Sequence, residues 1–182
     1  MHHYGTMTES AVESAIVVEV AEVGRVVDAH RRVLDPSAAW GLPAHVTVLY
    51  PFIPPAQLDE DAFSAIERAL SGLAGFEVAF SRTAWFGEQV LWLAPEPDDP
   101  FRLVTSRLIE AYPDYPPYGG AIADPIPHLT VGDGSPIQAL RQAEEAIRAR
   151  LPIVALVTHV SVMTGSFAED SWKTVSRIRL AG

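Results

Sequence analysis

Apolar and polar positions along the chain follow two periods, one typical of strands and one typical of helices. Ser14–Val20 (SAIVVEV) is rich in β-branched residues and predicts a strand. Apolar residues recur at helical spacing over residues 21–34 and predict a helix. A strand through His45, a helix capped by Asp59 and a strand over residues 76–86 then complete the first half.

The second half of the chain repeats this order of elements. Its predicted elements are, in chain order, a strand over 89–93, a helix from Asp99-Pro100, a strand through His128, a helix from Ser135-Pro136, a strand over 153–163 and a closing strand over 172–180. The pattern predicts an α+β fold built from a duplicated βαβαβ unit. We expect a single domain over 7–182, with lobe halves of roughly 14–86 and 89–180.

The two halves differ most in the segment over residues 112–127 (YPDYPPYGGAIADPIP). Its five prolines and two glycines disfavour regular structure and indicate a shaped loop. The loop runs directly into His128, so we expect it at the mouth of the cleft.

One polar pattern occurs in both histidine-bearing strands. His45-Val46-Thr47-Val48 is echoed by His128-Leu129-Thr130-Val131. Neighbouring side chains in a strand point to opposite faces, so each histidine shares a face with its threonine while the apolar residues occupy the other face. Two such strands facing one another would supply two imidazoles and two hydroxyls to one cleft.

These four groups suit acid–base chemistry on a phosphate ester. Hydrolysis of a phosphodiester without a metal needs a base that takes a proton from water and an acid that protonates the leaving oxygen. The pKa of an unperturbed histidine is about 6.5, so it can take either role near neutral pH. Threonine hydroxyls can donate hydrogen bonds to the non-bridging oxygens as charge develops.

Length and charge narrow the function further. At 182 residues the chain has the size of one domain, and its net charge of −10 argues against the basic surface that captures long nucleic acid. The chain has no cysteine, no run of about 20 apolar residues that would span a membrane, and no signal-peptide layout. We therefore expect a soluble cytoplasmic protein without membrane partners, and we interpret residues 1–6 (MHHYGT) as the remnant of a tag.

The segments HVTVLYPF and PHLTV resemble the paired His-x-Thr signatures of the 2H phosphoesterase superfamily, whose best-known branch is the 2'-5' RNA ligase-like (LigT-like) family. The resemblance implies a bilobal fold with antiparallel-rich sheets around a central cleft. It also implies hydrolysis of a 2',3'-cyclic phosphate or a 2'-5' phosphodiester, with neither metal nor cofactor. It implies that His45 and His128 are the acid–base pair and that Thr47 and Thr130 hold the phosphate. Sequence leaves open which histidine is the acid.

This chain departs from the RNA-processing relatives in one respect. In many of them a basic residue comes directly after the second motif, whereas in this chain Val131 is followed by Gly132-Asp133-Gly134. Together with the acidic net charge, this favours a mononucleotide-sized or non-nucleic cyclic phosphate. We expect a small cyclic-phosphate or nucleotide substrate, with an RNA end as an alternative but without an extended nucleic-acid surface.

Four further side chains are candidates for substrate binding. Tyr118, beside two glycines and close to the second motif, is expected to line the cleft and stack on a base. Phe52 lies just past the end of the first motif strand. Arg82 and Trp85 lie on a strand that borders the site, where the arginine is a candidate for a phosphate contact.

Two alternatives remain beside a phosphoesterase of nucleotides. One is a binding module that holds a nucleotide or RNA end without turning it over. The other is a phosphoesterase that acts on a phosphorylated metabolite that carries no nucleobase.

For any of these functions we expect a monomer, because a duplicated fold has no obvious need of a partner. His159 lacks the acidic partner and close spacing of a zinc site.

Overall fold

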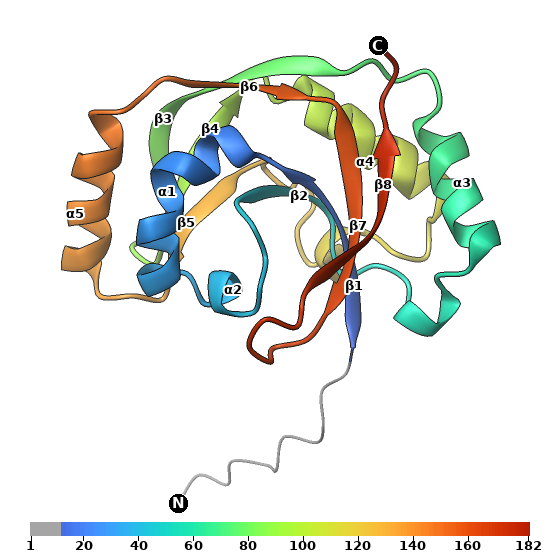
Figure 1. Ribbon diagram of the computed structural model, residues 1–182, viewed down its shortest axis with the longest axis horizontal. Helices are drawn as coiled ribbons and strands as arrows, with labels where there is room; N and C mark the ends of the chain where they lie inside the picture. The colour runs from blue at the N-terminus through green and yellow to red at the C-terminus, as the bar shows by residue number, and fades with distance from the viewer. Residues whose placement is uncertain (1–11) are drawn as a thin grey trace, which may run out of the picture.

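The computed structural model describes residues 12–182 (Figure 1). The predicted tag remnant lies outside the described residues. The strands are β1 (Glu13–Glu19), β2 (His45–Leu49), β3 (Phe76–Phe86), β4 (Val90–Glu96), β5 (Leu129–Asp133), β6 (Ile153–Val157), β7 (His159–Gly165) and β8 (Lys173–Arg179). The helices are α1 (Ala21–Leu34), α2 (Pro36–Ala39), α3 (Glu60–Leu70), α4 (Asp99–Ala111) and α5 (Ile137–Arg148), with short 3-10 turns η1 (Pro55–Gln57) and η2 (Pro117–Gly120).

The eight strands form one curled sheet in the order β6-β3-β4-β5-β2-β1-β7-β8. Every neighbouring pair in this order is antiparallel. The predicted α+β class and antiparallel sheet are thereby confirmed. The two histidine-bearing strands, β2 and β5, are neighbours at the centre of the sheet.

The duplication is visible in the strand order. Outward from the β5–β2 pair, β4 and β3 lie on one side in the same order as β1 and β7 on the other. A late strand of each sequence half therefore lies beside the first strand of the other half: β3 pairs with β4, and β7, the fourth strand of the second half, pairs with β1. The two halves thus complete one another's part of the sheet.

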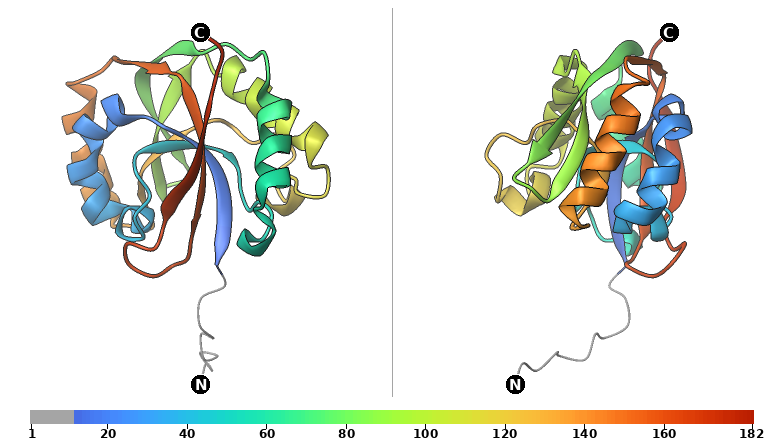
Figure 2. Two further views of the ribbon diagram at one scale, coloured as in Figure 1. Left: turned by 45° about the vertical axis from the view of Figure 1, so that its right-hand side comes forward. Right: turned by 90° about the vertical axis from the view of Figure 1, so that its left-hand side faces the viewer.

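One face of the sheet carries the main hydrophobic core, which includes alternate residues of every strand. The helices cover this face in two pairs, α1 with α5 and α3 with α4, on opposite sides of the molecule (Figures 1 and 2). Helix α3 begins as predicted, because the Asp59 carboxylate accepts a hydrogen bond of 2.9 Å from the Ala62 amide. The opposite face is left for the polar side chains of the central strands.

The expected single strand over residues 153–163 is wrong. The chain divides at Thr158 into β6, which pairs with β3 at one edge, and β7, which pairs with β1 toward the other edge. No glycine or proline marks the division, where Thr158 and His159 are two consecutive exposed polar residues. A turn signal is therefore missing at the point where the chain crosses the sheet.

Residues 12–182 contain no helix that is long and apolar enough to cross a membrane.

Candidate active site

The two His-x-Thr motifs meet through the pairing of β2 with β5. Val46 lies opposite Leu129 in this antiparallel pair. One step along the register sets His45 opposite Thr130 and Thr47 opposite His128, all on the face away from the helices. These four side chains line a single hollow of about 260 Å³. The structure therefore brings the predicted quartet together.

Both motif histidines are oriented by the same local hydrogen bond. Nδ1 of His45 lies 2.7 Å from the Pro43 carbonyl oxygen, and Nδ1 of His128 lies 2.7 Å from the Ile126 carbonyl oxygen. A carbonyl oxygen can only accept, so each Nδ1 carries the hydrogen. In the neutral ring, Nε2 is then the unprotonated nitrogen, and it is the position at which each histidine gains or gives a proton.

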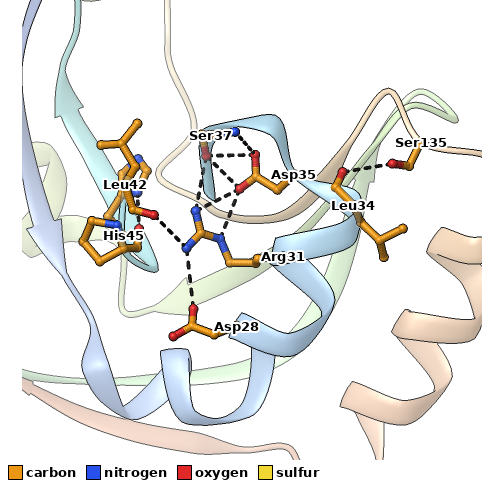
Figure 3. A network of polar contacts seen from close by, with 9 residues as sticks. Asp28, Arg31, Leu34, Asp35, Ser37, Leu42, His45 and Ser135 are labelled. Carbon is orange, nitrogen blue, oxygen red and sulfur yellow. Dashed lines mark hydrogen bonds and ion pairs between the residues drawn. The ribbon is translucent and has the colours of Figure 1, made fainter. Parts of the chain in front are cut away.

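The loop that precedes His45 is held by a buried arginine (Figure 3). Arg31, only 2% exposed, donates from Nε and Nη2 to Asp35 Oδ2 at 3.1 and 2.9 Å. Its Nη1 donates to the Leu42 carbonyl oxygen at 3.2 Å. Ser37 Oγ accepts from Arg31 and donates to the Asp35 carboxylate. This network connects the end of α1 to the backbone just before β2 and so fixes the approach of His45.

Burial lowers the pKa of both histidines. The pKa of His45 falls to about 4, mainly by desolvation and to a smaller extent through the positive charges of Arg31 and His128, while the Pro43 hydrogen bond opposes the shift. Burial also lowers the pKa of His128, again against the effect of a backbone hydrogen bond. Both rings are therefore neutral at pH 7 unless a bound anion stabilises the charged form.

Aromatic rings surround His128. The Phe86 ring meets the His128 ring edge-to-face at 4.9 Å, and the Trp92 ring lies at 5.8 Å. Phe86 and Trp92 stack on each other at 4.7 Å. This apolar wall explains the desolvation of His128 and limits the directions from which water or substrate can reach it.

Tyr118 lies in the cleft, as the sequence predicts. It lines the hollow of the four motif residues and two adjoining hollows, one reaching Thr47 and one reaching His128. Its backbone has φ 54° and ψ 32°, the left-handed region that non-glycine residues rarely adopt, and its amide donates to the Tyr50 carbonyl oxygen at 2.6 Å. Burial raises the pKa of the Tyr118 hydroxyl, which keeps it a neutral donor. Strain of this kind is typical of functional sites.

The other three predicted substrate-binding residues lie elsewhere. Phe52 is buried in the main core, edge-to-face against Tyr112 at 4.9 Å. Arg82 is exposed and forms an ion pair of 3.0 Å with Glu96. Trp85 turns to the helix side, where its indole donates to Glu144 at 3.1 Å. None of the three lines the hollow of the motif residues.

A β-bulge explains part of this difference. In the β3–β4 pair, Phe80 lies opposite Pro95 and Arg82 opposite Ala94, so Ser81 is an extra residue. Beyond it the faces are exchanged, and Trp85 points to α5. Phe86, one residue further on, reaches His128 instead.

Sequence reasoning missed the aromatic wall at the other end of the hollow. Trp40, Tyr50, Phe167 and Trp172 all line it. Trp40 meets Phe167 edge-to-face at 4.8 Å, and Tyr50 approaches Trp172 at 6.4 Å. These residues come from three separate segments, so no local periodicity could have grouped them.

Residues 12–182 contain no group of three or more His, Cys, Asp or Glu side chains arranged to hold a metal ion. The polar side chains that line the hollow carry imidazole, hydroxyl and carboxylate groups.

Sequence and fold both relate the chain to known proteins. The sequence model of the 2'-5' RNA ligase superfamily matches residues 17–166. No curated protein sequence matches the chain.

The crystal structure of TT0787 of Thermus thermophilus has a TM-score of 0.63 at 17% identity, covering 93% of this chain and 98% of that one. E. coli LigT complexed with 3'-AMP has a TM-score of 0.59 at 16% identity, covering 94% and 99%. LigT complexed with NADP+ has a TM-score of 0.56 at 16% identity, covering 96% and 100%. At these identities the likeness shows a shared fold.

Proposed function

Because the chain belongs to the 2'-5' RNA ligase superfamily, we propose that it is a metal-independent phosphoesterase that hydrolyses a 2',3'-cyclic phosphate or a 2'-5' phosphodiester of a nucleotide or small RNA end. The proposal rests on one observation: both His-x-Thr pairs line one hollow. The same Nδ1 hydrogen bond in both histidines gives further support. That E. coli LigT was crystallised with 3'-AMP and with NADP+ supports a nucleotide as the ligand.

In the proposed reaction, the two histidines exchange protons with water and with the leaving oxygen. One neutral imidazole takes a proton at Nε2 from a water molecule, whose oxygen forms a bond to phosphorus. The ester bond on the far side of phosphorus breaks, and the other imidazole, protonated, gives its Nε2 proton to the departing oxygen. A cyclic phosphate becomes a phosphomonoester, and the two histidines have exchanged protonation states.

We assign the base to His45 and the acid to His128. Of the two, His45 has the pKa that is lowered further, to about 4, so it is the ring more readily kept neutral. The negative charge of a bound phosphate opposes the effect of burial and favours protonation of His128. The hydroxyls of Thr47 and Thr130 donate to the non-bridging oxygens, where charge develops.

The direct test is turnover of nucleoside 2',3'-cyclic phosphates in the presence of EDTA. His45→Ala and His128→Ala should each reduce kcat by about 100- to 10,000-fold, the range expected for loss of a general acid or base. His159→Ala is the matched control, because His159 is exposed on β7 and does not line the hollow. Loss of wild-type turnover in EDTA, or full activity in both motif variants, would contradict the proposal.

One observation favours a second candidate function, a module that binds a nucleotide without turning it over. Burial lowers the pKa of both His45 and His128, so neither ring of the unliganded protein is charged and ready to act as acid at pH 7. Tight binding of a cyclic nucleotide without any product in the same assay would support this alternative.

A further inference from the structure

Asp133 ends β5 and lines the same hollow as His128 and Thr130. In a regular strand a residue three places after Thr130 would point to the opposite face. The pairing with β4 shows why it does not: Thr130 lies opposite Trp92, whereas Gly132 lies opposite Leu91, so β5 has one extra residue. This bulge brings Asp133, which lies opposite Val90, to the cleft side of the sheet.

Gly132 makes this bulge compatible with the core. A Cβ at this position would lie 2.5 Å from Leu140 Cδ2 and 2.9 Å from Leu34 Cβ. The backbone of β5 therefore packs directly against α1 and α5 at the point where it turns Asp133 toward the cleft. The sequence Gly132-Asp133 is thus a structural unit that presents a carboxylate beside the motif residues.

The charge of Asp133 is not offset by a basic side chain of the described residues. Among residues 12–182, no lysine or arginine lines the hollow of the four motif residues or the adjoining hollow that Asp133 also lines. Asp35 lines the first of these hollows as well, and its carboxylate forms a buried ion pair of 2.9 Å with Arg31. Burial, and to a smaller extent the charge of Asp35, raises the pKa of Asp133.

We propose that Asp133 is a specificity-determining residue that restricts the substrate to a phosphodiester carrying a single negative charge and discriminates against a ligand with a second phosphate. This inference rests on the proposed function and narrows its substrate class. Asp133 and the four motif residues line one hollow of about 260 Å³, so a phosphate bound by the motif residues shares that hollow with the Asp133 carboxylate. The Debye length in physiological salt is about 8 Å, so repulsion acts across the whole hollow.

The preferred substrate is then a nucleoside 2',3'-cyclic phosphate with a free 5'-hydroxyl. The cyclic phosphate carries one charge, which the motif hydroxyls and a protonated histidine can hold. A 5'-phosphate adds up to two further charges, and no lysine or arginine of residues 12–182 lines the hollow of the motif residues to receive them. Arg102 lines the adjoining hollow that reaches Thr47, but its charge is paired with Asp98 and Asp124. An internal RNA linkage, with a phosphate on each side, is disfavoured for the same reason.

The kinetic test compares cytidine 2',3'-cyclic phosphate with its 5'-phosphorylated and its 5'-acetylated forms, the acetyl group serving as neutral bulk. Relative to the substrate with a free 5'-hydroxyl, we expect wild-type kcat/KM to be lower by about fivefold or more for the 5'-phosphorylated form and unchanged for the 5'-acetylated form. An effect of about fivefold is typical of like charges at partly exposed sites. Asp133→Asn should reduce this preference and Asp133→Arg should reverse it. Glu110→Gln replaces an exposed carboxylate on α4 and makes the same change in net charge as Asp133→Asn. It should leave the preference unaltered.

A binding measurement separates this inference from the proposed function. Calorimetry with adenosine 3'-monophosphate and adenosine 3',5'-bisphosphate needs no turnover. If Asp133→Arg raises the affinity for the bisphosphate but not for the monophosphate, the inference is supported. This holds even if neither wild type nor any variant hydrolyses a cyclic nucleotide, and that lack of turnover would overturn only the proposed function. The inference would be overturned if wild type and both Asp133 variants had equal kcat/KM for the 5'-hydroxyl and 5'-phosphate substrates and equal affinity for the two adenosine ligands. The proposed phosphoesterase function would then still stand.

Discussion

His45 and His128 have their Nδ1 atoms 2.7 Å from carbonyl oxygens two residues earlier in the chain, at Pro43 and Ile126. This bond selects one tautomer without help from a carboxylate, and the same two-residue offset recurs in each half because the motif strand is entered in the same way. Burial then makes the neutral form of each ring the favoured one. The tautomer is therefore set within two residues of each histidine, whereas the protonation state depends on residues distant in sequence, such as Phe86 and Trp92 around His128.

The depressed pKa of His45 predicts acid sensitivity of the fold. Its pKa is about 4 in the folded protein and 6.5 in a model peptide, so between these values the unfolded chain binds more protons. The stability contributed by the neutral ring is complete above pH 6.5 and is lost as the pH falls toward 4. Urea unfolding at several pH values should show this decline, and His45→Gln should flatten it. His159→Gln is the control, and parallel wild-type and His45→Gln curves would contradict the prediction.

The threonines should affect turnover more than stability. Thr47→Val and Thr130→Val keep the shape of the side chain but remove the hydroxyl that we assign to the non-bridging oxygens. Loss of one such donor typically reduces kcat by about 100-fold or more. Thr158→Val, at an exposed position between β6 and β7, is the control. Motif variants with unchanged kcat would exclude this role for the hydroxyls.

At the scale of elements, two bulges decide which side chains meet the substrate. The bulge at Ser81 turns Trp85 to the helices and Phe86 to His128, and the bulge after Thr130 turns Asp133 into the cleft. Bulges near functional sites commonly re-aim side chains in this way. Strand residues cannot be assigned to a face by counting in twos across such a point.

Gly132→Ala tests the second bulge. The added methyl group would lie 2.5 Å from Leu140 and 2.9 Å from Leu34, so the packing of α1 and α5 on β5 must change. We expect a loss of about 1–3 kcal/mol in the free energy of unfolding, measured in urea, as for other overpacked cores. Gly24→Ala in α1 is the control, because its nearest neighbour is the movable carboxylate of Asp28, and helix propensity favours alanine there. Equal effects of the two substitutions would contradict this account.

These elements also mark the limit of inference from sequence. The motif strands, the cap at Asp59 and the position of Tyr118 follow from local signals of period, capping and turn chemistry. The division at Thr158 does not, because neither glycine nor proline marks the point where the chain passes from β6 to β7. The aromatic wall of Trp40 and Trp172 depends on tertiary contacts between distant segments.

At the scale of the molecule, the exchange of strands β3 and β7 joins the two halves. Strand β3 pairs with β4 and β6, which both belong to the second half, and β7 pairs with β1 from the first half. The cleft lies at the boundary between the halves, on the strands that each contributes to the centre. Its two histidines are therefore brought together only when the whole sheet forms.

This exchange predicts cooperative unfolding. Urea denaturation followed by far-ultraviolet circular dichroism and by tryptophan fluorescence should give one coincident transition. The separate fragments 14–86 and 89–180 should each be unfolded, because each leaves one strand without its neighbours. Two resolved transitions, or a folded single fragment, would contradict the view of one interdependent sheet.

The central claim is that His45 and His128 act as base and acid, and the pH dependence of kcat/KM for a nucleoside 2',3'-cyclic phosphate tests it most directly. The base must be neutral and the acid charged, so activity rises through the pKa of His45 and falls through that of His128. Because both values lie below 6.5 in the free protein, the maximum should fall between about pH 4 and 6.5. We predict a bell-shaped profile that loses its acidic limb in His45→Ala and its alkaline limb in His128→Ala. A profile with the wild-type shape in both variants would contradict the claim.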